Sequence, residues 1–400
     1  MTTFNRRSWI QSSLGGIAAL SVSSYLKAAG ANERIRVSVI GRTGKGNYGH
    51  GLDKVWLEIP EAQIVAVADD NPEGLSKAAS ELKVEKAFAD YRVMLDEVKP
   101  DVVSICQRWL DKHHEMAMAC AERGIHMYME KPFVRTLTEA DEVVAACERT
   151  NTRLALACTA HYSPRVKKAK QLIAEGKIGQ VLEYRARGKE DSRGGGEDLW
   201  VLGPHMFDLI RLFGGAPTSC FASLMQQGRP VEKADIREGN EGLGPLAGDH
   251  VEAMYAMKDG ATAYFASKRG MGKGSGRFGL QIFGSEGIIE VMSGYMGDVK
   301  LLSDPTWSPG RSSQLWRTVS SAGIDQPEPI ERAESREGYR IAVLDLLDSI
   351  KDKRQPQCGM YEAHGTVEMI HAVFESHRLG KPAPMPLANR QHPLTMLSVR

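Results

Sequence analysis

The sequence predicts an α/β protein with two domains. The first is an amino-terminal Rossmann domain with a doubly wound parallel sheet, and the second is a carboxy-terminal α/β domain with a large, mainly antiparallel open sheet. Between residues 34 and 129, short β-branched runs alternate with helical patterns, which is typical of βαβ units. Beyond residue 216, strand patterns follow one another with Gly-containing turns between them, as in an antiparallel sheet.

The first half begins with a strand at residues 34–40 (RIRVSVI), and a cluster of glycines follows it. Apolar side chains at Leu52, Val55 and Trp56 then recur at helical spacing, so a helix is expected after the glycines. The later elements are a strand at 63–68, a helix at 74–83, a short strand at 86–90, a strand at 101–106, a helix at 110–123 and a strand at 126–129.

The second half begins with a strand at 153–158, a helix at 164–175 and a further strand. Strands are then expected at 216–224, 251–257, 262–267, 279–283 and 287–291, followed by a Ser/Pro-rich loop at 303–338 and helices at 340–351 and 366–378. The predicted division is a dinucleotide-binding domain at 32–152, a substrate and oligomerisation domain at 153–385, and an extended tail at 386–400.

Residues 1–31 have the features of a signal peptide. Arg6 and Arg7 precede a short apolar stretch at 14–26, and the small residues at 29–31 (AGA) offer a cleavage site. The paired arginines resemble a twin-arginine (Tat) signal, so we expect an exported, periplasmic or extracytoplasmic protein with no membrane anchor after processing. The alternative is a basic amino-terminal helix or a lipid-facing anchor.

Composition narrows the class of protein. The chain of 400 residues carries a formal net charge of +1 and no long basic run, which argues against a nucleic-acid partner. The cysteines show neither C-x-x-C spacing nor histidines at zinc-site spacing, so no metal site is predicted. Export would permit disulfides, but buried free thiols are expected, because two of the cysteines lie in apolar strand-like runs. The cysteines are Cys106, Cys120, Cys147, Cys158, Cys220 and Cys358.

The glycine cluster is the first candidate binding site. Counted from Gly41, the pattern G-x-G-x-x-G fails, because Thr43 stands at its second glycine; counted from Gly44, it fits Gly44, Gly46 and Gly49. A glycine cluster alone is as compatible with a plain turn. Here it lies between a strand and a predicted helix, where backbone N–H groups and the positive end of the helix favour a pyrophosphate.

An acidic residue supports the same interpretation. Asp69 ends the second predicted strand, where a carboxylate accepts the ribose hydroxyls of an adenosine and repels a 2′-phosphate. The sequence therefore predicts NAD as the cofactor, with its diphosphate over residues 44–49. The nearby cations of Arg42 and Lys45 leave NADP as the alternative.

The stretch MEKPF at residues 129–133 places Glu-Lys-Pro directly after a strand of the nucleotide-binding domain. With VAVADDNPE, IAEGKIGQV and HMFDLIRLFGG, it gives a sequence that resembles the Gfo/Idh/MocA oxidoreductases from about residue 34 to at least residue 290. The glycine segment is similar to that of exported bacterial members. The resemblance implies a bound nicotinamide cofactor, a sugar, cyclitol or similar polyol as substrate, and an open sheet that often supports homo-oligomers.

The same resemblance implies roles for individual residues. Lys131 corresponds to the catalytic lysine and His205 to the active-site histidine, while Glu130 and Lys131 contact the cofactor and a cis peptide precedes Pro132. These residue types suit alcohol oxidation, because a base must take the hydroxyl proton as hydride leaves. Histidine titrates near neutral pH, and a lysine beside a cationic ring has a lowered pKa.

One position departs from the family pattern. Many relatives carry an aspartate four residues before the histidine, and here that residue is Val201. Asp198 and Asp208 would lie on the same face as His205 if one helix extended across all three. Both are candidate substrate-site residues, and Asp208 is equally explained as a structural residue.

Two further candidates stand at the start of the second domain. His161 and Tyr162 occupy the place where relatives position residues that face cofactor and substrate, although a packed loop explains them nearly as well.

The predicted function is a nicotinamide-dependent oxidoreductase acting on a sugar, cyclitol or related polyol. The alternative within the family is an NAD-dependent glycosidase, in which transient oxidation permits elimination with no net cofactor turnover. A non-catalytic sugar- or cofactor-binding protein is the third possibility considered.

Overall fold

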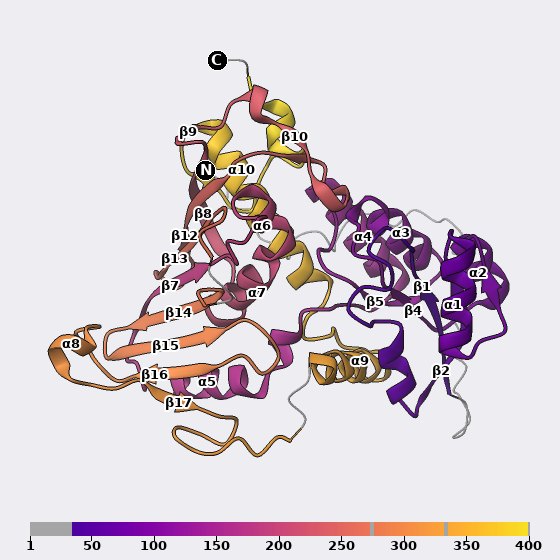
Figure 1. Cartoon of the computed structure of the whole chain (residues 1–400), viewed down its shortest axis with the longest axis horizontal. Coiled ribbons are helices and arrows are strands. Elements are labelled where there is room, and N and C mark those ends of the chain that lie inside the picture. The colour runs from indigo at the N-terminus through magenta and orange to yellow at the C-terminus, as the bar shows by residue number, and fades with distance from the viewer. Residues whose placement is uncertain (1–33, 273–275, 332–334, 399–400) are drawn as a thin grey trace, which may run out of the picture. The chain divides into compact units, whose positions relative to one another are not determined.

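The computed structural model of the chain describes residues 34–272, 276–331 and 335–398, so the predicted signal peptide lies outside the described residues. Six parallel strands form the first sheet, in the order β3-β2-β1-β4-β5-β6 (Figure 1). The chain continues from β1 to β2 on one side of β1 and later places β4 on its other side. In such a fold, ligands bind in the crevice beyond the carboxyl ends of β1 and β4. The predicted Rossmann sheet is confirmed. Its strands are β1 (Ile35–Ile40), β2 (Ala62–Ala68), β3 (Ala87–Phe88), β4 (Val102–Ile105), β5 (His126–Met129) and β6 (Leu154–Leu156).

Capping residues fix where the helices of this domain begin. Asn71 accepts a hydrogen bond from the N–H of Gly74 (2.9 Å) at the start of α1, whose first residue is Pro72. Asp90 accepts one from the N–H of Arg92 (2.8 Å) at the start of α2. The helices and 3₁₀ turns are η1 (Lys54–Glu58), α1 (Pro72–Leu82), α2 (Tyr91–Val98), η2 (Leu110–Lys112), α3 (His113–Glu122), α4 (Leu137–Thr150), η3 (Thr159–Tyr162) and α5 (Pro164–Ala174).

The connection from β1 to β2 differs from the prediction. Turns occupy the glycine segment, and only the five-residue 3₁₀ helix η1 follows it, so the expected α-helix after the glycines is wrong. Gly44, Gly46, Gly49 and Gly51 all have positive φ, a backbone conformation that a right-handed helix cannot contain. The apolar spacing after Gly51 instead buries Val55 and Trp56 from a single short turn.

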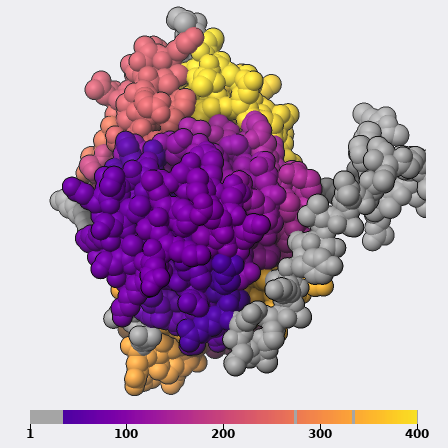
Figure 2. Space-filling view, turned by 90° about the vertical axis from the view of Figure 1, so that its right-hand side faces the viewer, coloured from indigo at the N-terminus to yellow at the C-terminus, as the bar shows by residue number. Residues whose placement is uncertain are grey.

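A helix from the carboxy-terminal part of the chain packs against the short connection between β1 and β2. Helix α9 (Ser335–Lys351) contacts η1 and the strands β5 and β6 of the first sheet (Figure 1). The two domains are thus joined by packing as well as by sequence. Figure 2 shows that the first domain, coloured indigo to purple, forms most of one face of the protein.

The second sheet has ten strands and confirms the predicted large, mainly antiparallel sheet. The order is β17-β16-β15-β14-β7-β13-β12-β8-β18, with β9 paired to β8, and among the described strands of this sheet only the β7–β13 pair is parallel. Its strands are β7 (Val181–Arg187), β8 (Pro217–Gln226), β9 (Arg229–Pro230), β12 (His250–Met257), β13 (Thr262–Lys268), β14 (Gly279–Gly284), β15 (Gly287–Met292), β16 (Val299–Leu302), β17 (Arg317–Val319) and β18 (Ala383–Pro384).

The two faces of this sheet differ in what covers them. Helix α10 packs on β8, and the hydroxyl of Tyr255 on β12 donates to the carbonyl of Met369 in α10 (2.9 Å). On the other face Phe221, Met254 and Tyr264 are exposed and lie side by side on β8, β12 and β13. The remaining elements are α6 (Gly196–Val201), α7 (Gly203–Gly214), η4 (Lys233–Asp235), the β10 (Arg237–Glu238) and β11 (Pro245–Leu246) pair, η5 (Asn240–Gly242), α8 (Pro309–Ser312), α10 (Met360–Leu379) and η6 (Pro393–Met396).

The loop expected at 303–338 and the state of the cysteines were two further expectations from the sequence. The expected loop at 303–338 contains α8, β17 and the start of α9, so it is only partly irregular. All six cysteines are buried and free, as predicted. Among the described helices, none is long and apolar enough to span a membrane.

Candidate active site

The carboxyl end of β5 places Glu130 and Lys131 at the ligand-binding edge of the first sheet. Lys131 is only 8% exposed, and its Nζ donates a hydrogen bond to the carbonyl of Val201 (2.9 Å) at the end of α6. The Lys131–Pro132 peptide is cis, as the resemblance implied. This contact brings the ammonium group of the first domain against the helical segment that carries the candidate histidine.

Glu130 is held as a buried carboxylate by two neighbours. Its Oε2 accepts the N–H of Lys131 (2.7 Å), and its Oε1 pairs with the ring Nδ1 of His50 from the glycine segment. Burial alone would raise the pKa of Glu130, but the hydrogen bond from His50 and the charge of Lys131 hold it below its usual value. The negative charge therefore persists beside Lys131.

His205 lies in the first turn of α7 and is partly buried. Burial lowers its pKa to about 3, and the positive charges of Lys131 and His50 add to that effect. Its ring packs edge-on against Phe278 at a centroid distance of 6.2 Å, and within the described residues its nitrogens have no hydrogen-bond partner. A neutral imidazole with an unused nitrogen thus lies near the ammonium group of Lys131.

The structure separates Asp198, but not Asp208, from the helix that carries His205. Asp198 lies in α6 and His205 in α7, so one helix does not extend across all three residues, whereas Asp208 shares α7 with His205. Asp198 is fully buried, with one oxygen accepting from Ser267 Oγ (2.5 Å) and from the N–H of Glu190 (3.1 Å), and burial raises its pKa. At the position of the missing aspartate, Val201 contributes only its backbone carbonyl, which accepts from Lys131.

His161, Tyr162 and Asp208 belong to a buried network rather than to an open site. Asp208 accepts from Nδ1 of His161 at 3.1 and 3.3 Å. The hydroxyl of Tyr162 donates to Asp345 (3.0 Å), and this side chain is 1% exposed, so it presents nothing to a substrate in this structure.

In the nucleotide-binding half, the carboxylate of Asp69 is buried and already has protein partners. The N–H of Thr43 lies 3.0 and 3.1 Å from its two oxygens, and the hydroxyls of Thr43 and Tyr48 donate at 2.7 and 2.9 Å. The N–H of Asn71 adds a further bond of 3.0 Å. Asp69 therefore fixes the glycine segment, whereas the sequence led us to expect it to face the ribose.

The glycine segment combines close packing with an open turn. A Cβ added to Gly41 would lie 2.1 Å from the ring of Tyr48, so only glycine admits that ring. Gly44 has φ of +81° and nothing within 4 Å of an added Cβ. Among the described residues, the N–H groups of Gly46 and Tyr48 have no acceptor, so they can donate to phosphate oxygens.

A cavity of about 260 Å³ lies beside Asp69 at the carboxyl ends of β1 and β2. Charged groups of both signs line it, including Asp70, Asp90 and Arg92. Arg42 also lines it and is paired with Asp111 (2.8 Å) and, at 3.6 Å, with Asp70. The cavity, the free N–H groups and the nearby cations fit the adenosine and diphosphate of a dinucleotide.

The comparisons with known proteins agree with this arrangement. A sequence model described as the oxidoreductase family with an NAD-binding Rossmann fold matches residues 35–158, and a model of the GFO/IDH/MocA C-terminal domain matches residues 166–290. The chain belongs to the GFO/IDH/MocA oxidoreductase family. Its first domain is therefore an NAD-binding Rossmann domain, as predicted.

Curated relatives of this GFO/IDH/MocA protein include dehydrogenases. It is 28% identical over 247 residues to levoglucosan dehydrogenase of Pseudarthrobacter phenanthrenivorans, covering 56% of this chain and 63% of that protein. It is 25% identical over 176 residues to myo-inositol 2-dehydrogenase of Thermotoga maritima, covering 44% and 49%. The chain thus spans less than two thirds of the length of these relatives.

Solved structures share the fold over a longer range. Levoglucosan dehydrogenase in complex with NADH matches with a TM-score of 0.71 at 22% identity, covering 89% of this chain and 100% of that one. An aldose-aldose oxidoreductase from Caulobacter crescentus complexed with glycerol matches with a TM-score of 0.69 at 16% identity, covering 88% and 100%. At these identities the likeness concerns the fold alone.

His50 and Tyr48 are site residues that the sequence did not reveal. Their partners, Glu130 and Asp69, lie 80 and 21 residues away along the chain. The only available signal was their position inside the glycine segment, where a polar side chain reaches the ends of neighbouring strands.

Proposed function

We propose that this GFO/IDH/MocA protein is an NAD-dependent oxidoreductase that transfers a hydride to or from a CH–OH carbon of a sugar, cyclitol or related polyol. The observation that carries the proposal is the approach of Lys131 from β5 to the segment bearing His205, at the ligand-binding edge of a Rossmann sheet. Dehydrogenases of levoglucosan and myo-inositol among the relatives support the substrate class.

The side chains divide the work in a consistent way. The bound nicotinamide ring supplies the hydride acceptor or donor. Lys131 uses one N–H on Val201, which leaves two to donate to the reacting oxygen. His205 is neutral at pH 7, so its free nitrogen can accept the hydroxyl proton as the alcohol becomes a carbonyl. Glu130 keeps a negative charge beside Lys131.

The test combines anaerobic turnover with matched variants. Purified protein is incubated with NAD and a panel of sugars and cyclitols, and reduced cofactor is followed by absorbance together with product analysis. Lys131→Met and His205→Ala should each lower kcat by about 10²–10⁴-fold, because general acid–base groups contribute that much. His250→Ala, a change on β12 of the second sheet, serves as the control that keeps activity. Near-wild-type turnover by either site variant would refute the assignment.

The cofactor preference is NAD over NADP. Asp70 and Asp90 line the cavity beside Asp69, and their negative charges oppose a 2′-phosphate. Arg42 and Arg92 also line it, but Arg42 is already paired with two carboxylates. Calorimetry should give tighter binding of NAD than of NADP, and the reverse order would overturn this preference.

The glycosidase alternative is not favoured, because the relatives in the comparison are largely dehydrogenases. The same assay separates the two functions. A glycosidase would release sugar without stoichiometric reduced cofactor, whereas the proposed dehydrogenase yields one reduced cofactor for each alcohol oxidised.

We also propose that the protein is a homo-oligomer that pairs through the open face of the second sheet. Phe221, Met254 and Tyr264 are 47%, 42% and 38% exposed and adjacent on three neighbouring strands. Large apolar side chains grouped on a surface are typical of an interface. Sedimentation should give a dimer or larger species, and Met254→Glu should dissociate it; a wild-type monomer at micromolar concentration would contradict the proposal.

Export by the twin-arginine route remains a proposal that rests on Arg6, Arg7 and the apolar stretch at 14–26. That route carries folded proteins, so the cofactor would be loaded before export, and free nicotinamide outside the cytoplasm is not required. An Arg6→Lys, Arg7→Lys double variant should stay in the cytoplasm with its leader uncut. Continued export of that variant, or exported protein empty of cofactor, would refute the proposal.

A further inference from the structure

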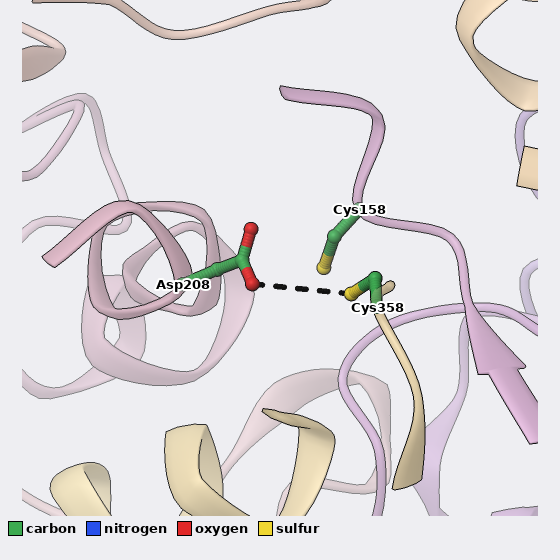
Figure 3. A group of neighbouring side chains, drawn as sticks. All are labelled: Cys158, Asp208 and Cys358. Carbon is green, nitrogen blue, oxygen red and sulfur yellow. Dashed lines mark hydrogen bonds between the residues drawn. The ribbon is translucent and has the colours of Figure 1, made fainter. Parts of the chain in front are cut away.

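Two thiols and a carboxylate from three separate segments converge inside the protein (Figure 3). Cys158 follows β6, Asp208 lies in α7, and Cys358 lies two residues before the start of α10. One ligand atom from each residue lies within 4.8 Å of the other two, and Cys358 Sγ is 3.9 Å from Asp208 Oδ1. None of the three has been given a role in the proposed reaction.

The three side chains of this cluster are almost completely shielded from solvent. Asp208 is 2% exposed, and the two cysteines are 1% exposed each. Among the ion pairs of the described residues, the only partner of Asp208 is His161. Buried charges in proteins are paired or coordinate a metal, and among the described residues no Arg or Lys pairs with Asp208.

The ligand types and spacing match a known coordination chemistry. Zn²⁺ binds Cys sulfur at about 2.3 Å and carboxylate oxygen at about 2.0–2.2 Å in tetrahedral geometry, which places neighbouring ligand atoms about 3.5–3.8 Å apart. The observed separation of 3.9 Å between Cys358 Sγ and Asp208 Oδ1 is close to that edge. In this structure the thiol of Cys358 donates a hydrogen bond to that oxygen, and its proton would leave when a metal ion binds.

We propose that Cys158, Cys358 and Asp208 bind one Zn²⁺ ion, with water as the fourth ligand. Binding converts two thiols to thiolates and releases two protons. The two thiolates, the carboxylate and the divalent ion sum to one negative charge. His161 is an outer partner that holds the Asp208 carboxylate in place.

The position of the ion gives it a structural role. It ties the end of the last strand of the first sheet to α7 and to the start of α10, three segments that are far apart in sequence. Asp208 lies three residues after His205, one turn along the same helix. The ion therefore stabilises the helix that carries His205 without contacting the reacting atoms.

The test uses the full-length protein purified with reductant, treated with chelator and titrated with Zn²⁺ or Co²⁺. We expect one ion per chain by mass spectrometry of the metal content, a raised unfolding midpoint and a thiolate-to-Co²⁺ charge-transfer band. Cys158→Ser and Cys358→Ser should each weaken Zn²⁺ binding more than tenfold and abolish that band. His161→Gln should weaken it about 10–100-fold, as loss of an outer partner does.

The control is Cys220→Ser, because Cys220 is a buried free thiol on β8 outside the cluster. It should retain one Zn²⁺ per chain and the Co²⁺ band. Wild-type protein that takes up no Zn²⁺ would overturn the proposal, and so would full binding by the Cys158→Ser, Cys358→Ser double variant. A Cys158–Cys358 disulfide that persists in the reduced, Zn²⁺-treated protein would also overturn it, and the wild-type readouts decide the matter even if a variant fails to fold.

Discussion

Replacing Gly49 by alanine should damage the protein far more than the same change at Gly44. Both residues have positive φ, +62° and +81°, so alanine at either costs about 1–2 kcal/mol of backbone strain. At Gly44 nothing lies within 4 Å of the new methyl group. At Gly49 the methyl group would lie 2.4 Å from the carbonyl oxygen of Cys106 and 2.8 Å from Cγ of Glu130.

The second contact adds to the cost at Gly49. Relieving overlap with a backbone oxygen requires the loop or β4 to move, and such overpacking costs about 1–3 kcal/mol. The free energy of unfolding should therefore fall by about 2–5 kcal/mol for Gly49→Ala and by about 1–2 kcal/mol for Gly44→Ala. Displacement of Glu130 should also disturb Lys131, so kcat should fall only in the Gly49 variant.

Urea unfolding followed by circular dichroism, with linear extrapolation to zero denaturant, measures both free energies. Turnover under saturating NAD measures the effect on Lys131. Losses that agree within about 0.5 kcal/mol for the two variants would show that close packing against Cys106 and Glu130 does not constrain this loop.

Three further outcomes are expected. Burial lowers the pKa of His371 to about 4 and that of His392 to about 3, so below pH 6.5 the unfolded state binds more protons than the folded state. The free energy of unfolding should therefore fall by about 2 kcal/mol per histidine between pH 7 and 5. A His371→Gln, His392→Gln variant should show a shallower slope in pH-dependent unfolding. His50→Ala should raise the pKa of Glu130 and cost about 1–3 kcal/mol in urea unfolding, whereas an unchanged free energy would mean that the ion pair is not needed. Asp69→Asn should weaken NAD binding about tenfold in calorimetry, because Asp69 holds Thr43 and its loop, and unchanged affinity would contradict that role.

Much of the fold could be predicted because its signals are local. The strand at His126–Met129 was expected at those residues, since an apolar run ends there at Glu130. The glycine segment could be recognised from the sequence. The α-helix expected after it does not form, because four positive-φ glycines override the apolar spacing after them. Local propensity could not indicate that α9, about 280 residues later, would pack on η1.

The candidate site likewise contains residues that the sequence could indicate and contacts that only the tertiary structure shows. Lys131 and His205 were named because the sequence resembles a family with known roles, and no spacing within this chain links two residues 74 positions apart. Cys158 and Cys358 are 200 residues apart, so their convergence on Asp208 depends on tertiary packing. At Val201 the sequence shows that the aspartate of many relatives is absent, but it could not show that the carbonyl of Val201 accepts a hydrogen bond from Lys131.

The hydrogen bonds that Asp69 makes to Thr43 and Tyr48 also bear on how quickly a cofactor can bind. A glycine-rich loop that is free in solution loses conformational entropy when it closes on a ligand, at a cost of about 1–2 kcal/mol for each residue fixed. Here that entropy is lost when the chain folds, because a strand-end carboxylate anchors the loop in advance. Rigid loops of this kind bind with less rearrangement, so association should approach the rate set by diffusion and orientation, and affinity should depend mainly on how slowly the cofactor dissociates.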